Sequence, residues 1–384
     1  MKTKKSWIDN AYIYHILVDR FGGDTTRKNT NQFMGGTLKY ISRHLDYIQH
    51  MGFNTLWLSP ICESKNYHGY HITDFYKVDP HFGTMDDLQE LITNVHSRGM
   101  RIVSDFVPNH CADTHPFFVE AKTEIHNRYR DWFYFNEDGT YRCFMNFDEL
   151  PKFNLDQEKV RKYMTDVAKY WCEAGFDGLR IDHAIGPSFN FWKTWMAEMK
   201  KHYPNKLFIG EVWCAGLTPD LFSTVHLKHE WRKKKQGRSQ EELQKDYVGV
   251  LDGVLDFAFR DIVLRHIYKG ERLIGNKDLE WEVKRHFSKY PKSFKLILFL
   301  DNHDSDRILF HCKGDLTLRD EAIDFCKSQR RPFIIYYGTE ANMSNKESIF
   351  SGIPYADLAV RECLKIDDKA PKAQRQEKVQ QKRH

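Results

Sequence analysis

Short apolar runs alternate along the chain with longer segments of helical periodicity. The runs predict eight buried strands, because β-branched and aromatic residues dominate them and turn residues bound them. They lie at residues 12–21, 53–59, 101–107, 175–182, 207–213, 254–259, 294–301 and 332–338. Between them, segments such as 85–98 and 158–174 carry apolar residues on one helical face. Eight strand–helix repeats predict an α/β fold, and they favour a closed TIM (β/α)8 barrel over an open sheet.

One interval breaks this rhythm. About seventy residues separate the third predicted strand from the fourth, and positions 109–156 are rich in aromatic and turn residues. Such a stretch is too long for an ordinary connection and predicts an inserted subdomain over one rim of the barrel. We therefore predict a catalytic barrel from residues 1–108 and 157–366, an inserted subdomain at 109–156, and a polar, disordered tail at 367–384.

Composition and charge exclude several classes of protein. Of the 384 residues 41% are hydrophobic and 14% aromatic, so a large core is available and a disordered chain is excluded. The net charge of +5 is small, and residues 367–384 hold six Lys/Arg against three Asp/Glu. The charged run WRKKKQGRSQEELQKD, within a second excursion at 214–250, is interpreted as a solvated surface segment. We therefore predict no nucleic-acid partner.

Targeting signals and cysteines indicate the compartment. No signal peptide is predicted. The sequence has no uncharged stretch long enough to span a membrane, so a membrane partner is not predicted either. The eight cysteines form no CxxC pair, which supports neither a zinc ribbon nor a disulfide framework. Reduced thiols and a cytoplasmic location are therefore expected.

Polar residues gather where the predicted strands end. The C-terminal ends of the strands in a barrel share one rim, and reactive side chains lie there. The candidates are Asp105, Asn109, His110, Arg180, Asp182, His183, Glu211, Asp301, Asn302, His303 and Asp304. One acid at such a position is more often structural, but acids at several strand ends, with an arginine two residues before one of them, indicate catalysis.

Carboxylates without an activated Ser or Cys or a clear metal site suit retaining glycoside hydrolysis, in which one acid is the nucleophile and the other the proton donor. Arg180 and Asp182 share one face of a strand, so the guanidinium is expected to lower the pKa of Asp182 and keep it ionised. Glu211 has apolar and aromatic neighbours in the sequence, which is expected to raise its pKa and suits a general acid.

Four motifs then carry a family resemblance. DFVPNH (105–110), GLRIDHA (178–184), GEVW (210–213) and FLDNHD (299–304) resemble, in this order, the four signature regions of the α-amylase family, glycoside hydrolase family 13. Supporting matches lie at residues 67–84, 150–154 and 332–340, and the resemblance covers about residues 7–361. LPKFN at 150–154, together with Ala184, is similar to the neopullulanase and cyclomaltodextrinase branch.

The resemblance implies a role for each matching residue. Asp182 matches the nucleophile, Glu211 the acid/base, and Asp304 the third carboxylate, which holds sugar hydroxyls and favours the distorted ring. The residues expected to bind substrate are Tyr70, His68, His110, Arg180 and His303, and those expected to support the site are Asp105 and Asn109. No metal is predicted among the catalytic residues.

The activity implied is hydrolysis, with retention, of α-1,4-linked glucooligosaccharides or starch-type α-glucans, which are the expected partners. A transglycosylase on the same substrates is the main alternative, because both reactions share the covalent intermediate. A non-catalytic carbohydrate-binding relative is less favoured, because all three carboxylates are present.

Two family features depart from the pattern. The positions of the family's calcium site hold Asn109, Asn154 and Gly186 here, and calcium prefers carboxylate oxygens. No cofactor is therefore predicted as required, and calcium is kept as an alternative. The last barrel helix is expected to include residues 353–364, and the β-sandwich domain that follows in relatives is expected to be absent.

Overall fold

The structure, a computed structural model, describes residues 6–213 and 239–367. The barrel strands are β1 (Tyr12–Ile16), β2 (Thr55–Leu58), β5 (Arg101–Phe106), β6 (Gly178–Ile181), β7 (Leu207–Gly210), β8 (Gly253–Leu255), β9 (Lys295–Ile297) and β10 (Phe333–Tyr336). The helices around them are α1 (Leu38–Arg43), α2 (Leu45–His50), α3 (Met85–Ser97), α5 (Glu158–Glu173), α6 (Phe189–His202), α8 (Gln240–Lys245), α9 (Phe257–Tyr268), α10 (Lys277–Ser288), α11 (Ile308–His311) and α12 (Leu316–Ser328). Most of the predicted tail and the first part of the charged run lie outside the described residues.

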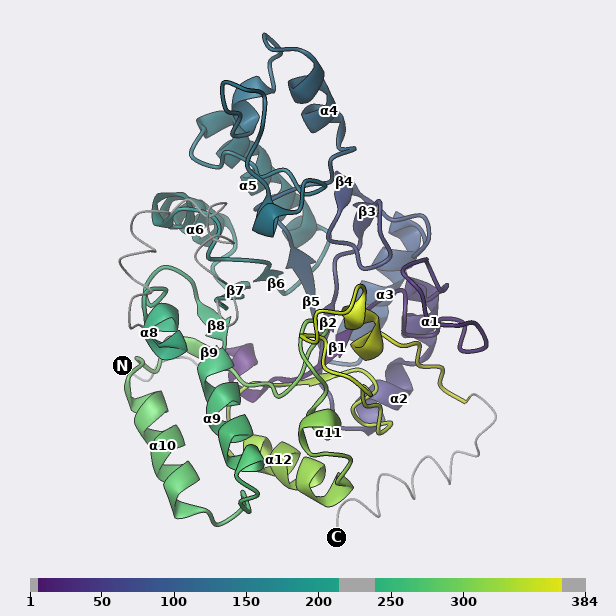
Figure 1. The fold of residues 1–384 in the computed structure, drawn as a ribbon, viewed down its shortest axis with the longest axis vertical. Coiled ribbons are helices and arrows are strands. Elements are labelled where there is room, and N and C mark those ends of the chain that lie inside the picture. The colour runs from purple at the N-terminus through teal and green to yellow at the C-terminus, as the bar shows by residue number, and fades with distance from the viewer. Residues whose placement is uncertain (1–5, 214–238, 368–384) are drawn as a thin grey trace.

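The eight parallel strands form one sheet in the order β10-β1-β2-β5-β6-β7-β8-β9. The two outer strands of this order meet at a parallel bridge between Leu298 and Phe333. There the Leu298 N–H donates to the Pro332 carbonyl and the Ile334 N–H to the Leu298 carbonyl, each at 2.8 Å. The sheet therefore closes, and the predicted (β/α)8 barrel is confirmed (Figure 1).

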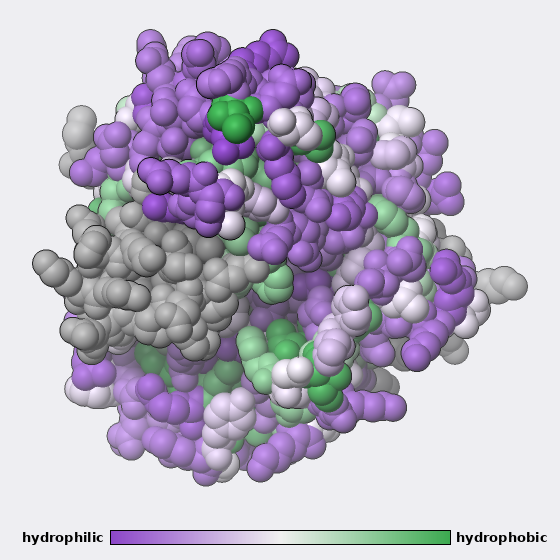
Figure 2. All heavy atoms as spheres, turned by 45° about the horizontal axis from the view of Figure 1, so that its top comes forward, coloured by the Kyte–Doolittle hydropathy of each residue, from purple (hydrophilic) through white to green (hydrophobic). Residues whose placement is uncertain are grey.

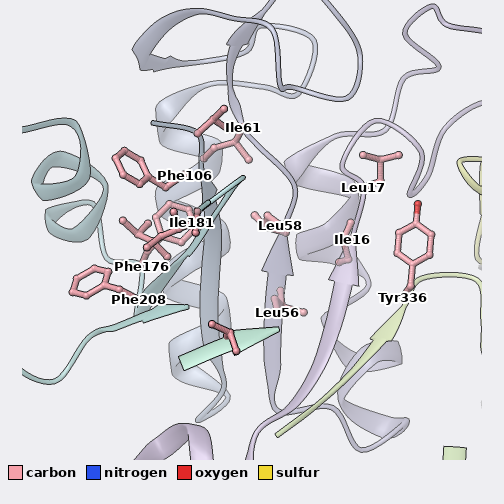
Figure 3. Packing of buried hydrophobic residues seen from close by; sticks show 14 of the residues in the cluster. Ile16, Leu17, Leu56, Leu58, Ile61, Phe106, Phe176, Ile181, Phe208 and Tyr336 are labelled. Atoms are coloured by element: carbon pink, nitrogen blue, oxygen red, sulfur yellow. The ribbon is translucent and has the colours of Figure 1, made fainter. Parts of the chain in front are cut away.

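Side chains alternate between two buried clusters along the strands. On β2, Trp57 belongs to the smaller cluster, which includes residues of seven of the eight barrel strands and fills the barrel interior. Its neighbours Leu56 and Leu58 belong to the larger cluster between strands and helices (Figure 3). Successive side chains of a strand point to opposite faces, and both faces of a barrel strand are buried. Each strand therefore appears in the sequence as a short, continuous apolar run. The alternation also turns Asp105, two residues after the interior Val103, into the barrel.

The sixth predicted strand, 254–259, is wrong in its second half. The strand ends at Leu255, and Asp256 caps helix α9 by accepting a hydrogen bond from the Phe259 N–H at 3.0 Å. The residues Phe257 to Phe259 are all buried, so this first turn of α9 has no polar face. A helix buried on all sides lacks the amphipathic pattern, which explains the error.

The segment between β5 and α5 contains α4 (Pro116–Thr123), two short 3₁₀ helices and several isolated bridges. Aromatic rings pack it together: the centroid of Phe118 lies 4.9 Å from Phe133 and 4.8 Å from Tyr141. Beside it lies the hairpin of β3 (Cys62–Ser64) and β4 (Ile72–Val78), which the sequence pattern did not predict. In Figure 1 the segment that contains α4 forms the top of the molecule, and the β3–β4 hairpin lies below it on the right. The subdomain boundaries at 109 and 156 stay a prediction.

The segment after β10 differs from its prediction. Residues 353–364 contain a 3₁₀ helix, Ala356–Val360, and no α-helix. The chain then returns to the segment that follows β1, where the Leu364 N–H donates to the Arg20 carbonyl at 3.0 Å and the Gly22 N–H to the Leu364 carbonyl at 2.7 Å. This path carries Arg361 over the rim of the barrel.

His286 of α10 joins this helix to α8 and to the start of α9. Its Nε2 lies 2.8 Å from Asp256 Oδ2, and its Nδ1 lies 3.1 Å from Glu241 Oε2 of α8. Burial by itself lowers the pKa of His286, but the two carboxylates outweigh burial and raise it above its ordinary value. A histidine with a higher pKa in the folded state contributes stability that is complete below its unfolded pKa and is lost as the pH rises through the folded pKa.

We therefore expect His286→Gln to lower the free energy of unfolding by about 2 to 3 kcal/mol at mildly acidic pH, and by less at alkaline pH, where the wild type has also lost the charge. Urea unfolding across this pH range measures the difference. His202→Gln is the control, because His202 is half-exposed and pairs with Glu198 along one helix. Parallel pH curves for the wild type and H286Q would contradict the expectation.

The described residues contain no helix that is long and apolar enough to cross a membrane. The face turned to the viewer in Figure 2 is mostly hydrophilic, with hydrophobic residues exposed in small patches. Six cysteines of the described part, Cys62, Cys111, Cys172, Cys312, Cys326 and Cys363, are free thiols, and all of them except Cys363 are buried.

Candidate active site

Arg180 lies at the centre of a carboxylate cluster on the C-terminal rim of the barrel. Its Nη1 lies 2.7 Å from Asp105 Oδ1 and 2.9 Å from Asp182 Oδ1, and its Nη2 lies 2.6 Å from Glu211 Oε1. The three acids come from the neighbouring strands β5, β6 and β7, or follow them directly. Only 2% of Arg180 is exposed. The structure thus brings together these four residues, as the strand-end pattern predicted.

Glu211 is held by the turn that follows β6. The His183 N–H donates to Glu211 Oε2 at 3.0 Å, and the Ala184 N–H donates to the Glu211 carbonyl at 2.9 Å. His183 has a φ of 43°, in the left-handed region that non-glycine residues rarely adopt. The contribution of this candidate to the site is therefore a backbone N–H, which side-chain motifs do not reveal.

The predicted electrostatic contrast between Asp182 and Glu211 is not found. Burial raises the pKa of both carboxyl groups, and the Arg180 guanidinium opposes the increase in both. The expected lowering for Asp182 alone assumed that Arg180 contacts only its neighbour on the strand, whereas the guanidinium reaches Glu211 as well. The two carboxyl groups share one guanidinium, and their separate roles rest on the family resemblance.

Asp304 differs from Asp182 and Glu211 in that its pKa is lowered and not raised. Its Oδ2 lies 2.9 Å from His303 Nε2, and its Oδ1 lies 2.7 Å from Arg361 Nη2. Burial alone would raise the pKa of Asp304, but His303 and the Arg361 guanidinium outweigh burial and lower it. Asp304 is therefore ionised, which fits the role of the third carboxylate that the family resemblance implies.

Arg361 was not predicted as a site residue. It also pairs with Asp357 at 2.6 Å, four residues earlier, and opposite charges at this spacing are typical of an exposed helix. Arg361 is instead buried, and its Nε donates to the His303 carbonyl at 2.9 Å. The fold brings it to the site from a segment without a family motif.

Tyr70 and His303 form a flat aromatic wall beside the carboxylates. Their rings are stacked at 5.3 Å and 6°, and the Tyr70 hydroxyl contacts His303 Nε2 at 2.6 Å and Asp105 Oδ2 at 2.9 Å. His68 lies next to Tyr70, with ring centroids 5.7 Å apart. Aromatic faces and ring nitrogens of this kind suit a sugar, which has apolar faces and hydroxyl edges.

His110 completes the predicted binding set. Its Nδ1 lies 3.3 Å from the Asn109 amide nitrogen, while its buried Nε2 has no hydrogen-bond partner among the described residues. Burial lowers the pKa of His110 to about 3, so the ring is neutral and can both donate and accept hydrogen bonds.

The other candidates after the seventh barrel strand shape the rim instead. Asp301 Oδ2 accepts hydrogen bonds from the Ile308 N–H and the Thr339 hydroxyl, away from the cluster. Asn302 Oδ1 accepts from the Asp304 N–H at 3.0 Å. These contacts fix the turn that presents His303 and Asp304.

Trp57 and His15 form a floor beneath the cluster that the motifs did not indicate. The Trp57 Nε1–H donates to Asp105 Oδ2 at 3.3 Å, and the Arg180 guanidinium lies 5.3 Å from the Trp57 ring. The His15 ring stacks on the Trp57 ring, with the two ring centroids 3.5 Å apart. The alternation along β1 and β2 would have placed both side chains inside the barrel.

A calcium ion does not fit the residues at the family's calcium position. Among the three groups of this position, the Gly186 carbonyl accepts a hydrogen bond from Lys152 Nζ at 2.8 Å. Asn154 donates its amide to the Asp131 carbonyl, and the buried Asn109 Oδ1 is a neutral oxygen without a hydrogen-bond partner in the described part of the chain. That part also contains no cluster of three or more His, Cys, Asp or Glu residues suited to a metal.

The barrel with several carboxylates on its C-terminal rim and an aromatic wall beside them defines the class of (β/α)8 glycoside hydrolases. Residues 15–383 match the family model of the α-amylase catalytic domain, and the chain belongs to this family. The resemblance drawn from the four motifs is thereby confirmed.

Individual relatives agree with this assignment. The chain is 36% identical over 351 residues to alpha-amylase 2 of Dictyoglomus thermophilum, which covers 90% of this chain and 57% of that protein. It is 29% identical over 368 residues to neopullulanase 2 of Thermoactinomyces vulgaris, at 89% and 58% coverage. The crystal structure of an α-amylase from Geobacillus thermoleovorans with acarbose matches with a TM-score of 0.75 and 27% identity, covering 98% of this chain and 78% of that one. The chain thus spans somewhat more than half the length of the two curated relatives, and the neopullulanase supports the predicted branch.

Proposed function

We propose that this protein hydrolyses α-glucosidic bonds of maltooligosaccharides or starch-type α-glucans with retention of configuration. The observation that carries the proposal is the pair of contacts from Arg180 to Asp182 and to Glu211. One guanidinium keeps the two carboxylates close together, and a retaining enzyme needs them only about 5 to 5.5 Å apart. The substrate class rests on the family and on the names of the relatives, an α-amylase and a neopullulanase.

In the proposed reaction Asp182 attacks the anomeric carbon while Glu211 gives its proton to the leaving glycosidic oxygen. A glycosyl ester forms on Asp182 and the glycosidic bond breaks. Glu211, now ionised, takes a proton from water, which attacks the same carbon and releases Asp182. The ionised Asp304 stabilises the positive charge that develops on the ring.

The first product released from maltotetraose is expected to be the α-anomer. Proton NMR during the first minutes of digestion, before mutarotation, reads the anomer directly. The anomer ratio of a glucan already at anomeric equilibrium, recorded with the wild-type enzyme present, serves as the baseline. A β-configured first product would contradict the proposed retention.

Transfer to a sugar is a second candidate, favoured by the aromatic residues next to Glu211. The Trp213 ring stacks on Phe257, with the ring centroids 5.2 Å apart. The ring of Phe350, which is 61% exposed, lies 6.2 Å from the ring of Trp213. An acceptor sugar can stack on such a surface. Products longer than the substrate at high substrate concentration would distinguish transfer from hydrolysis.

We also propose a cytoplasmic location. The six free thiols named above are in the state expected in a reducing compartment. Alkylation of the intact protein after rapid lysis would show whether these thiols are free in the cell.

A further inference from the structure

Lys152 is a buried lysine at the junction between the β5–α5 segment and the barrel. Only 1% of it is exposed, and its backbone forms an isolated antiparallel bridge with His110. Its Nζ donates to the Gly186 carbonyl at 2.8 Å. Burial, followed by the charge of Arg142, lowers the pKa of Lys152 to about 7, as expected for an amino group shielded from water. A buried lysine is unusual unless a specific contact requires it.

Gly186 belongs to the turn that holds Glu211. The Gly186 N–H donates to the His183 carbonyl at 2.9 Å, and the His183 N–H donates to Glu211 Oε2 at 3.0 Å. The turn is tightly packed, because a Cβ on Gly186 would lie 2.2 Å from Asn109 Oδ1 and 2.7 Å from His183 Cδ2. The hydrogen bond from Lys152 therefore continues through this turn to the carboxyl group of Glu211.

The hydrogen bond between Lys152 and the Gly186 carbonyl also bears on whether a metal ion can bind at this junction. A calcium ion would need the Gly186 carbonyl as a ligand, but the Lys152 amino group already occupies that oxygen. Its charge also lowers the pKa of His183, after burial, which shows that the two groups are near each other. A second cation at this place would meet electrostatic repulsion and neutral amide oxygens.

We propose that Lys152 is a positioning residue for Glu211, and that its amino group takes the place of a calcium ion at this junction. The first half rests on the proposed glycosidase function. The second half concerns the fold alone and does not depend on activity.

Lys152→Met tests the first half, because methionine has a similar length and no donor. Lys65→Met is the control: Lys65, in the β3–β4 hairpin, pairs with Asp113 of the β5–α5 segment at 3.0 Å but is exposed at the surface. Two substrates are compared, maltotetraose, whose leaving group needs a proton, and α-maltosyl fluoride, whose leaving group needs little help. All assays are run below the pKa of Lys152, so that its amino group is protonated.

K152M is expected to lower kcat on maltotetraose by up to about 100-fold, with a much smaller loss on the fluoride. Lys152→Arg, which keeps a charged donor, is expected to retain more activity on maltotetraose than K152M, and K65M to behave as the wild type. An equal loss on both substrates, or no loss, would overturn the positioning role. A wild type inactive on both substrates would instead count against the proposed function.

Thermal melting of the wild type tests the second half without any substrate. The melting midpoint is expected to be the same in EDTA and in millimolar calcium chloride, and isothermal titration with calcium chloride is expected to give no binding heat. A midpoint that rises with calcium would overturn this half of the proposal.

Discussion

Asp182→Asn is expected to lower kcat/KM on maltooligosaccharides by about 10⁴-fold or more, because loss of a nucleophile removes the covalent route altogether. The amide keeps the shape of the side chain and can still contact Arg180, so the fold should be retained. Initial rates of reducing-sugar release from maltotetraose measure the loss, and thermal melting confirms folding.

Asp177→Asn is the matched control for this change. Asp177 precedes the same strand, β6, at the opposite rim of the barrel, where it pairs with Arg101 at 2.8 Å. We expect its activity to stay within a few-fold of the wild type. Activity of D182N comparable to that of D177N would remove Asp182 from the role of nucleophile.

Glu211→Gln is expected to lower kcat on maltotetraose by about 10² to 10⁴-fold, the usual contribution of a general acid. The acid must be protonated to act, so the wild-type rate should fall as the pH rises through the raised pKa of Glu211. Glutamine has no such proton, and the alkaline fall should be missing in the residual activity. The pH dependence of kcat/KM in both proteins measures this.

A comparison of two substrates distinguishes the loss of the acid from a loss of folded protein. E211Q should keep far more activity on α-maltosyl fluoride than on maltotetraose, because fluoride leaves without a proton. Glu198→Gln, on the surface of α6, is the control and should leave both rates unchanged. An E211Q protein with near wild-type turnover of maltotetraose would exclude Glu211 as the acid.

The apolar runs of the sequence predicted the barrel strands because the burial of each strand shows in its own few residues. Each strand is short and buried on both faces, so its apolar residues stand together in the sequence. Prediction failed where burial was complete in a helix, as at the start of α9, and where a hairpin, β3–β4, carried polar residues such as Glu63 and Asp74. In both places packing against distant elements decided the structure.

The candidate site shows the same division. Asp105, Arg180 and Asp182 meet as predicted, because period-two alternation and strand order fix their approach. The pKa of Asp182 was wrongly predicted, because a single guanidinium serves carboxylates from three strands, which no local pattern records. Arg361 was missed because only the return of the chain to the segment after β1 brings it to Asp304.

That return has a consequence for how the protein becomes active during its synthesis. β1 pairs with β10 as well as with β2, and the contact of Gly22 with Leu364 joins residues from opposite ends of the described chain. While the ribosome is still making the second half, the first strand lacks one neighbour and Asp304 lacks Arg361. A nascent chain therefore carries Asp182 and Glu211 before β1 can pair with β10, and the proposed activity is expected to arise in a late step, when both ends of the barrel meet.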